Sequence, residues 1–437
     1  MREKNDKKLQ WAWAFYDWAN SVYPLVVTTA IFPTFYEAIT TQKTEAGVVI
    51  TDKVEFFGYL FSNTELYSYV ISASFLVVSF LSPLLSGLAD FWGNKKFFLK
   101  IFCYLGAISC GALYFFDMEY LELSMIPVFT ASIGFWGSLV FYNAYLPEIA
   151  EPQDHDKLSA RGFSLGYVGS ALLLIIILIL IMVVGMNARY SFIMVMVWWI
   201  GFAQYSLLKL PTYTNEYKHD KPNLWKGIQE LKKVWNELKH IRLIKSYLGA
   251  FFVYSMGVQT VLLMAVLFAA KEVDWGSDDA GKTGLIISVL LIQFIAIIGA
   301  GLFSRMSKKF GNIRVLKVAV FMWVLVCIWA YFIETPVDFY VTAGIVGFVM
   351  GGIQALSRST YSKMLPETED HASYFSFYDV LEKLGIVIGT LSYGLIEAMT
   401  GSLRNSIFAL AAFFVVGLIL LFFVPKHDWS KPTTVIE

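Results

Sequence analysis

The feature that most constrains the fold is a series of about a dozen apolar runs, each near 20 residues, in a chain of 437 residues. A helix needs about 20 apolar residues to cross a hydrocarbon core of roughly 30 Å. The chain is 57% hydrophobic and 16% charged, whereas a soluble domain carries about 25% charged residues. We therefore predict an all-α integral membrane protein with twelve transmembrane helices. The expected helices cover residues 12–39, 63–89, 97–116, 122–146, 162–186, 189–210, 244–272, 283–307, 315–334, 337–364, 376–400 and 404–424.

The second half of the chain repeats features of the first. The tripeptide Leu-Pro-Glu at 146–148 recurs 219 positions later at 365–367, and Gly-Asn at 93–94 recurs 218 positions later at 311–312. Half of 437 residues is about 218, so the offset equals the length of one half. A duplicated bundle of membrane helices is typical of secondary transporters, which bind substrate between the halves near the bilayer midplane.

The repeat predicts two six-helix halves related by pseudo-two-fold symmetry, at residues 1–210 and 244–437. Residues 211–243 form the longest polar segment between them. Its latter part places apolar side chains on one face at helical spacing. This pattern predicts a cytoplasmic linker with an amphipathic helix at the headgroup level.

The distribution of basic residues predicts the orientation, because cytoplasmic loops carry excess Lys and Arg. If the N-terminus is cytoplasmic, the outer connections hold only six of the 34 Lys and Arg residues. An even number of helices then places both termini in the cytoplasm. The basic N-terminal tail has no adjoining small-residue cleavage site, so we do not expect it to be a signal peptide.

Several classes of chemistry are not expected. Cys103, Cys110 and Cys327 lie inside apolar runs without paired spacing, which argues against a disulfide framework or a metal site. No nucleophile lies beside a base, so we expect no enzyme activity and no cofactor. The five His residues fall in loops or tails, so any proton coupling must depend on carboxylates. The zero net charge argues against a nucleic-acid partner.

Polar residues within the first predicted helix are functional candidates, because a charge at the centre of a spanning helix costs at least about 2.5 kcal/mol. Asp17 and Asn20 share one helix face with Pro24 and Thr28. Proline removes a helical hydrogen bond and frees a carbonyl that can line a cavity. We interpret Asp17 as a candidate for proton coupling and Asn20 as a candidate substrate ligand. A structural carboxylate at the interface is the alternative for Asp17.

A polar stripe ends the tenth predicted helix, where Gln354, Ser357, Arg358 and Tyr361 occupy positions i, i+3, i+4 and i+7. Arg358 can hold a substrate carboxylate through its planar guanidinium, or it can form a structural ion pair. Amides inside other helices must also find hydrogen-bond partners. The substrate-binding candidates beside Asn20 are therefore Gln259, Gln293, Gln354, Arg358 and Tyr361.

The eleventh predicted helix carries Asp379, Glu382 and Lys383. Asp379 and Lys383 are four residues apart and can pair along the helix. Glu382 then has no obvious local partner unless it faces Arg358. Both acids are proton-coupling candidates, and a salt-bridge latch between the tenth and eleventh helices is the alternative.

Residues 86–96 read SGLADFWGNKK between the second and third predicted helices. This segment resembles the signature of the major facilitator superfamily, in which glycine, aspartate and basic residues fill a tight cytoplasmic turn. Ser86 stands where that pattern has its leading glycine, and Asn94 replaces a basic residue. The second half keeps only a weak copy, with Ser307 and Lys308 where an acid would stand.

The resemblance implies a cytoplasmic latch that holds an outward-open state and breaks when the halves rock. Asp90 can cap a helix N-terminus across the boundary between the halves, and the lysines that follow can meet carboxylates such as Glu148. The implied latch residues are Asp90, Gly93, Lys95, Lys96, Glu148 and Arg161.

Three segments are similar to the vacuolar amino-acid effluxer-like branch of that superfamily, which is sometimes called the unknown major facilitator family. They read YDWANS at 16–21, SARGFSLGY at 159–167 and QALSRS at 354–359. The similarity spans nearly the whole chain and implies export of amino acids or similar small metabolites.

The expected function is secondary active transport by alternating access, with proton-coupled export of a small metabolite such as an amino acid. The alternative is an uncoupled facilitator or an exporter of amphiphilic compounds. The expected partners are a small-molecule substrate, protons and membrane lipids, and the expected state is a monomer. Compact loops favour a bacterial inner membrane over a vacuole.

Overall fold

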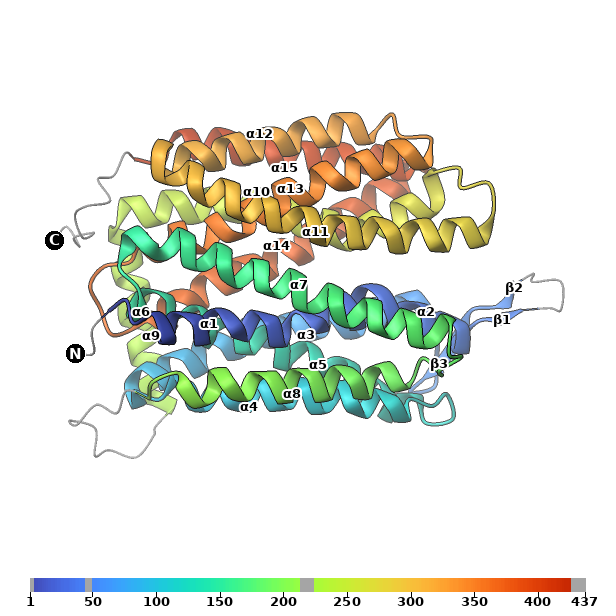
Figure 1. Ribbon diagram of the computed structural model, residues 1–437, viewed down its shortest axis with the longest axis horizontal. Coiled ribbons are helices and arrows are strands. Elements are labelled where there is room, and N and C mark those ends of the chain that lie inside the picture. Colours follow the sequence, from blue (N-terminus) through green and yellow to red (C-terminus); the bar gives the residue numbers. More distant parts are fainter. Residues whose placement is uncertain (1–3, 44–48, 213–223, 426–437) are drawn as a thin grey trace.

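In the computed structural model, which describes residues 4–43, 49–212 and 224–425, long helices run side by side along one axis (Figure 1). The first helix has three parts, and its middle part is π-helical. The helices of the first half are α1 (Lys7–Asn20), η1 (Tyr23–Ile31), α2 (Phe32–Thr40), α3 (Asn63–Trp92), α4 (Lys95–Ala112), η2 (Leu113–Phe115), α5 (Leu121–Asn143), α6 (Leu146–Ile149), η3 (Pro152–Asp154), α7 (His155–Met182) and α8 (Tyr190–Lys209).

The second half repeats this arrangement after a helix that connects the two. The connecting helix is α9 (Leu224–His240). The helices that follow it are α10 (Arg242–Glu272), α11 (Asp278–Phe310), α12 (Asn312–Ala330), α13 (Pro336–Met364), α14 (His371–Thr400) and α15 (Leu403–Phe422).

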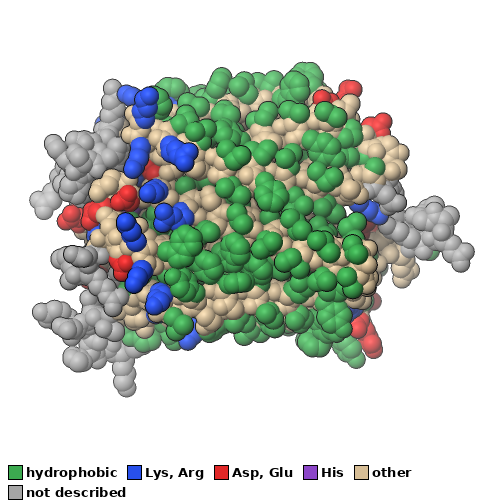
Figure 2. Space-filling model, in the orientation of Figure 1, with side chains coloured by type: hydrophobic (Ala, Val, Ile, Leu, Met, Phe, Trp, Pro, Cys, Tyr) green, Lys and Arg blue, Asp and Glu red, His purple; other side chains and the backbone are tan. Residues whose placement is uncertain are grey.

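Within the described residues, eleven helical segments are long and apolar enough to cross a membrane. Helix α14 has 30 residues but carries Asp379, Glu382 and Lys383, which make it less apolar. With α14, the bundle contains the twelve long helices that the sequence predicts. Hydrophobic side chains cover the middle of the face shown in Figure 2, where lipid tails would lie.

The loop between α2 and α3 contains short strands that the sequence did not predict. Phe57 and Gly58 have φ angles of 50° and 79°, and they form a two-residue connection of the kind that favours a twisted hairpin. The strands are too short to give a recognisable alternating pattern. The antiparallel pairs are β1 (Gln42–Lys43) with β2 (Val49–Thr51) and β3 (Lys53–Phe56) with β4 (Tyr59–Ser62).

The break in the first helix follows from Pro24, which has no amide hydrogen to donate. Pro24 lies at the start of η1. Its carbonyl accepts hydrogen bonds from the hydroxyls of Thr28 and Thr29, at 2.7 and 2.8 Å. Single π-helical turns within α-helices occur frequently at functional sites. The break therefore directs attention to the face of the helix that carries Asp17 and Asn20.

The two halves meet through a small set of helices. Helix α7 packs against α11 and α13, and α3 packs against α14. Helix α9 lies against α3 of the first half and also contacts α10 and α14 of the second. On α9, Val234 and Leu238 are buried, whereas Trp225 and Trp235 are exposed.

The contact between α11 and α13 depends on a glycine that allows the two backbones to approach. A Cβ atom at Gly299 would lie 1.9 Å from the carbonyl oxygen of Phe348, whereas a Cβ at Gly301 would meet nothing within 4 Å. We expect Gly299→Ala to force the helices apart and to lower the melting temperature of the purified protein in detergent by several degrees. The control Gly301→Ala, in the same helix, should leave it unchanged or raise it, because Ala is the better helix former. Equal melting temperatures for the two variants would contradict this account of the packing.

Candidate functional site

A cavity of about 300 Å³ lies between the halves and is lined by residues from both. Aliphatic and aromatic residues make up slightly more than half of its wall, and polar residues make up the rest. Those polar residues are Asp17, Asn20, Ser21, Thr28, Thr29, Asn143, Tyr167, Ser170, Tyr254, Ser255, Gln259, Gln293, Gln354, Ser357, Arg358, Tyr378 and Glu382.

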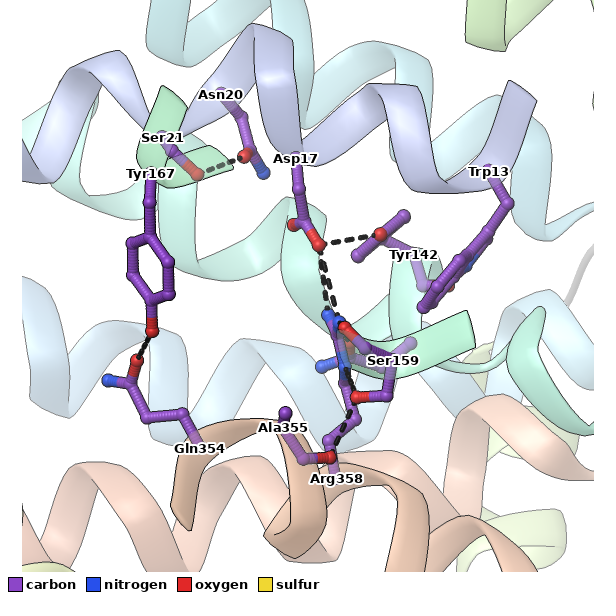
Figure 3. Close-up of polar contacts among 11 residues, drawn as sticks. Trp13, Asp17, Asn20, Ser21, Tyr142, Ser159, Tyr167, Gln354, Ala355 and Arg358 are labelled. Atoms are coloured by element: carbon purple, nitrogen blue, oxygen red, sulfur yellow. Dashed lines mark hydrogen bonds and ion pairs between the residues drawn. The ribbon is translucent and has the colours of Figure 1, made fainter. Parts of the chain in front are cut away.

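Asp17 of α1 and Arg358 of α13 form an ion pair in the cavity wall that joins the two halves (Figure 3). Both Nη atoms of Arg358 lie 3.3 Å from Oδ2 of Asp17. The Tyr142 hydroxyl donates to the same oxygen at 2.8 Å. The two charged side chains are only 4% and 7% exposed, so most of their attraction is not screened by water.

Arg358 has further partners in the first half. Its Nε atom donates to the Ser159 hydroxyl at 3.0 Å, and Nη2 donates to the Ser159 carbonyl at 3.0 Å. The Ser159 hydroxyl in turn donates to the carbonyl of Ala355 at 2.8 Å (Figure 3). The guanidinium lies 4.1 Å from the ring centroid of Phe163. These contacts fix the guanidinium plane, so Arg358 is held by the first half at several points.

Two predicted substrate ligands lie near this ion pair. The hydroxyl of Tyr167 donates to Oε1 of Gln354 at 2.6 Å, which is another contact between the halves (Figure 3). Asn20 is buried, and its Nδ2 atom has no hydrogen-bond partner. Both residues line the cavity, so their free amide hydrogens are available to a bound molecule.

The second group of predicted residues lies on α10, α11 and α14. Gln259 donates from Nε2 to Oε1 of Glu382 at 2.8 Å. Lys383 lies 2.5 Å from Oδ1 of Asp379 and 3.0 Å from Oε2 of Glu382. Gln259, Gln293 and Glu382 line the cavity, whereas Asp379 lies behind its wall. Glu382 therefore pairs within its own half, and Arg358 is bonded to Asp17 instead.

Tyr361 does not line the cavity. It is fully buried, and its hydroxyl donates to the carbonyl of Tyr374 at 2.6 Å. Its ring also stacks with that of Tyr378, with centroids 5.1 Å apart. In this conformation, Tyr361 links α13 to α14 within the second half.

We call the end of the bundle that carries the N-terminus and the starts of α4 and α14 the terminal end. Here Asp90, at the end of α3, accepts hydrogen bonds from the backbone amides of Ala372 and Ser373 at 3.2 and 2.6 Å. The carboxylate thus caps α14 of the other half, where the helix dipole favours a negative charge. Gly93 ends α3 with a φ of 69°, a left-handed conformation that glycine adopts readily.

Glu148 is the centre of a second contact at this end. It forms an ion pair with Lys95 of its own half, and its Oε1 atom lies at hydrogen-bond distance, 3.0 Å, from Nδ1 of His371 in the other half. The other two predicted latch residues face the first half: Lys96 donates to the Leu210 carbonyl at 2.8 Å, and the Arg161 guanidinium lies 5.9 Å from the ring centroid of Trp11.

Asp156, in the first turn of α7, forms a corresponding contact that the sequence analysis missed. It accepts hydrogen bonds from the Ser307 hydroxyl at 2.6 Å and from Nδ2 of Asn312 at 2.7 Å. Lys363 lies 2.6 Å from the same carboxylate. Asp156 is buried, and all three of its partners belong to the second half. The sequence analysis also missed Ser159, Lys363 and His371.

Helix α9 adds a contact between the linker and the second half. Lys233 lies 2.8 Å from carboxylate oxygens of both Asp370 and Glu230. Partial burial lowers the pKa of Lys233, but the hydrogen bonds to the two carboxylates outweigh this effect and raise its pKa above the ordinary value. Lys233 therefore stays charged at neutral pH.

The polar contacts between the halves lie in the part of the bundle that runs from the cavity wall to the terminal end. Arg358, Asp90, Glu148 and Asp156 are their centres. On the face shown in Figure 2, Lys and Arg side chains gather at this same end. In the part of the chain that the structure describes, this end is closed, and the cavity lies beyond the closure.

Comparison with solved structures identifies the fold. The fold matches the major facilitator superfamily proton:xylose symporter XylE with a TM-score of 0.70, covering 98% of this chain and 97% of that chain at 13% identity. It matches the transporter FucP in the outward conformation with a TM-score of 0.69, covering 97% and 99% at 14% identity. The chain therefore has the fold of the major facilitator superfamily, with two six-helix halves, as the sequence predicts.

A family model described as "Vacuole effluxer Atg22 like" matches residues 5–431, and the chain belongs to this family. An uncharacterized MFS-type transporter of Bacillus subtilis, YxiO, is 32% identical, over 97% of this chain and 96% of the relative. Autophagy-related protein 22 of Saccharomyces cerevisiae is 22% identical, over 78% of this chain and 74% of the relative. The family predicted from the three sequence segments is confirmed, and the chain is an integral membrane transporter rather than an enzyme.

The ion pair between Asp17 and Arg358 gives a prediction about stability. Asp17→Asn leaves a buried guanidinium that cannot lose its proton, and breaking a buried pair in this way costs about 3 kcal/mol or more. Arg358→Gln should cost less, because the remaining carboxyl can take up a proton. The double variant should recover most of the loss. Thermal unfolding in detergent measures all three, and a double variant as unstable as the sum of the single variants would show that the pair is not coupled.

The contacts of Asp156 give a prediction about conformation. We expect Asp156→Asn to weaken the closure, because the amide loses the attraction of Lys363. Spin labels at the exposed positions Lys157 and Lys309 should then show a larger fraction of long distances in pulsed electron resonance. Asp154→Asn, two residues away and outside the contact, is the matched control and should reproduce the parent distribution. No change in either variant would mean that Asp156 does not hold the closed end.

Proposed function

We propose that this transporter exports a small metabolite, such as an amino acid, by alternating access and in exchange for protons. The observation that carries the proposal is the buried Asp17–Arg358 ion pair, which lies in the cavity wall and joins the two halves. A carboxylate at this position is both reachable from the cavity and part of the closure. Its protonation state is therefore able to control the closure. The family description, which names effluxers, supports the direction of transport.

Asp17 couples the proton to the movement through its attraction for Arg358. A proton that enters the cavity and binds Asp17 removes the negative charge, so the strongest attraction between α1 and α13 is lost. The terminal end then opens. Arg358, freed from Asp17, has the planar donors that suit a substrate carboxylate. The proton leaves Asp17 toward the terminal side while that end is open. As the halves close again, Arg358 returns from the cargo carboxylate to Asp17, and the cargo is released on the opposite side.

The contacts of Asp90, Glu148 and Asp156 act as latches in this cycle. Each joins the halves at the terminal end, and each is made of groups that water can solvate when the end opens. Asp90 and Gly93 belong to the first latch, and Lys95 belongs to the second through its ion pair with Glu148. The movement therefore exchanges protein hydrogen bonds for hydrogen bonds with water, which keeps the two states close in free energy.

We infer that the terminal end faces the cytoplasm, because it is the end where Lys and Arg gather. Both termini then lie in the cytoplasm, and the bacterial relative YxiO supports location in a bacterial inner membrane. The cavity lies within one chain, so a monomer surrounded by lipid is sufficient for the cycle. Protons and the small-molecule cargo are the partners that this cycle requires.

One observation favours a second candidate function, in which the protein is an exporter of amphiphilic compounds or an uncoupled facilitator. Much of the cavity wall is apolar, with Phe75, Phe135, Leu139 and Phe251 among its residues. Such a wall suits the apolar part of an amphiphile. In this version Asp17 and Arg358 are structural, and protons do not move with the cargo.

The test is transport in liposomes that contain purified protein and a pH-sensitive dye. With amino acids added in pools on one side, we expect one pool to move protons in the opposite direction. Asp17→Asn should abolish proton movement, because Asn cannot bind the proton, and Asp274→Asn, which removes an exposed acid in a distant loop, should not. Movement of a radiolabelled pool without protons would replace this proposal with the facilitator. Absence of both signals for every pool would remove the amino-acid assignment.

A further inference from the structure

Glu382 is an acid in the cavity wall that the Asp17–Arg358 pair does not involve. Its Oε2 atom shares the ammonium of Lys383 with Asp379, and the side chain of Lys383 is fully buried behind the wall. The other oxygen, Oε1, receives a hydrogen bond from the neutral amide of Gln259. Two carboxylates therefore share one ammonium, and the carboxylate nearer the cavity is Glu382.

The charges around the cavity do not balance. Among the described residues that line it, the charged side chains are Asp17, Arg358 and Glu382. Asp17 and Arg358 neutralise one another, and Lys383 can neutralise only one of Asp379 and Glu382. One negative charge thus remains in a largely apolar site, where a charge without a partner is costly. A positive charge from the cavity would complete this site.

Aromatic side chains line the same cavity as the unbalanced charge. They are Trp136, Phe251, Tyr254 and Tyr378, and the ring of Tyr378 already stacks with Phe251 and Tyr361, with centroids 4.0 and 5.1 Å apart. The ammonium of Lys383 already lies 3.9 Å from the ring centroid of Trp136. The faces of such rings attract ammonium and guanidinium groups, most strongly where water is excluded. The Glu382 carboxylate and aromatic side chains thus occur in one cavity wall, a combination that suits an organic cation.

A second group in the cavity also lacks a partner. The Nδ2 atom of Asn20 is buried without a hydrogen-bond acceptor, and Asn20 belongs to the first half of the cavity wall. A buried amide donor of this kind is normally satisfied. The first half thus offers a donor, and the second half offers a negative charge beside aromatic rings. A molecule with an acceptor at one end and a cationic group at the other would satisfy both.

We propose that Glu382 and the surrounding rings bind a primary ammonium or guanidinium group of the cargo, so that the cargo is an amine-bearing compound. This inference rests on the proposed transport function, because it assigns the cargo of the same cavity. Among the described residues, the ion-pair and hydrogen-bond partners of Glu382 are Lys383 on its own helix and Gln259 on α10, so a cationic group of the cargo would be its only partner from the cavity.

The test measures binding to the purified full-length protein in detergent by calorimetry, without any gradient. The probes are tyramine and the methyl esters of leucine and phenylalanine, each with its N-acetylated counterpart, which carries no positive charge. We expect at least one amine to bind about tenfold or more tightly than its acetylated partner, which corresponds to about 1.4 kcal/mol. This comparison needs no variant, so it holds even where a substitution prevents folding.

Variants then assign the site. Glu382→Gln should weaken binding of that amine about tenfold or more. Glu397→Gln removes the same charge from an outer turn of the same helix, where Glu397 pairs with Lys271, and should leave binding unchanged. Equal binding of amine and acetylated probe, absence of binding by every amine, or unaltered binding in Glu382→Gln would each overturn the inference. Proton-coupled transport in liposomes together with such a result would leave the transport proposal intact and reject only the amine assignment.

Discussion

The ion pair between Asp17 and Arg358 is the interaction on which the arrangement of the two halves depends. It brings opposite charges from α1 and α13 together where little water can replace either partner. A buried pair of this kind adds little to net stability, but loss of one partner is costly. Such an interaction has two discrete states, made and broken, and it therefore suits a molecule that must alternate between two conformations. The bonds to Tyr142, Ser159 and Asn143 make the closed state geometrically specific.

The contacts at the terminal end repeat between the halves with their polarity exchanged. In one, the acid Asp90 ends α3 and the donors are backbone amides at the start of α14. In the other, the acid Asp156 lies at the start of α7 and the donors, Ser307 and Asn312, lie where α11 meets α12. In both contacts, a turn of one half lies against the start of a helix in the other half. Pseudo-symmetry therefore preserves the contact, although the acid lies in the turn in the first case and at the helix start in the second.

This exchange shows what the sequence could and could not predict. Apolar runs and the half-chain repeat were sufficient for the twelve helices, because lipid leaves few ways to satisfy a backbone. The helix cap by Asp90 was also expected, from the resemblance of its turn to the superfamily signature. Asp156 was missed because an acid was expected only at Ser307 and Lys308, the positions where an exact copy of the first-half motif would carry one. The absence of an acid at those two positions was the useful signal, because it indicates that the acid of this contact lies on the facing turn of α7.

Partners across the boundary were the least predictable feature of the cavity. Spacing along α14 indicated the contact between Asp379 and Lys383, because residues four apart lie on one helix face. No spacing can indicate whether Arg358 turns toward Glu382 or Asp17, because that choice depends on how α13 lies against α1 and α7. The choice has a consequence for function. Because Arg358 is bonded to residues of the first half, Glu382 pairs only with the ammonium of Lys383, which it shares with Asp379. The two halves of the cavity therefore present unequal charges to a molecule that enters it.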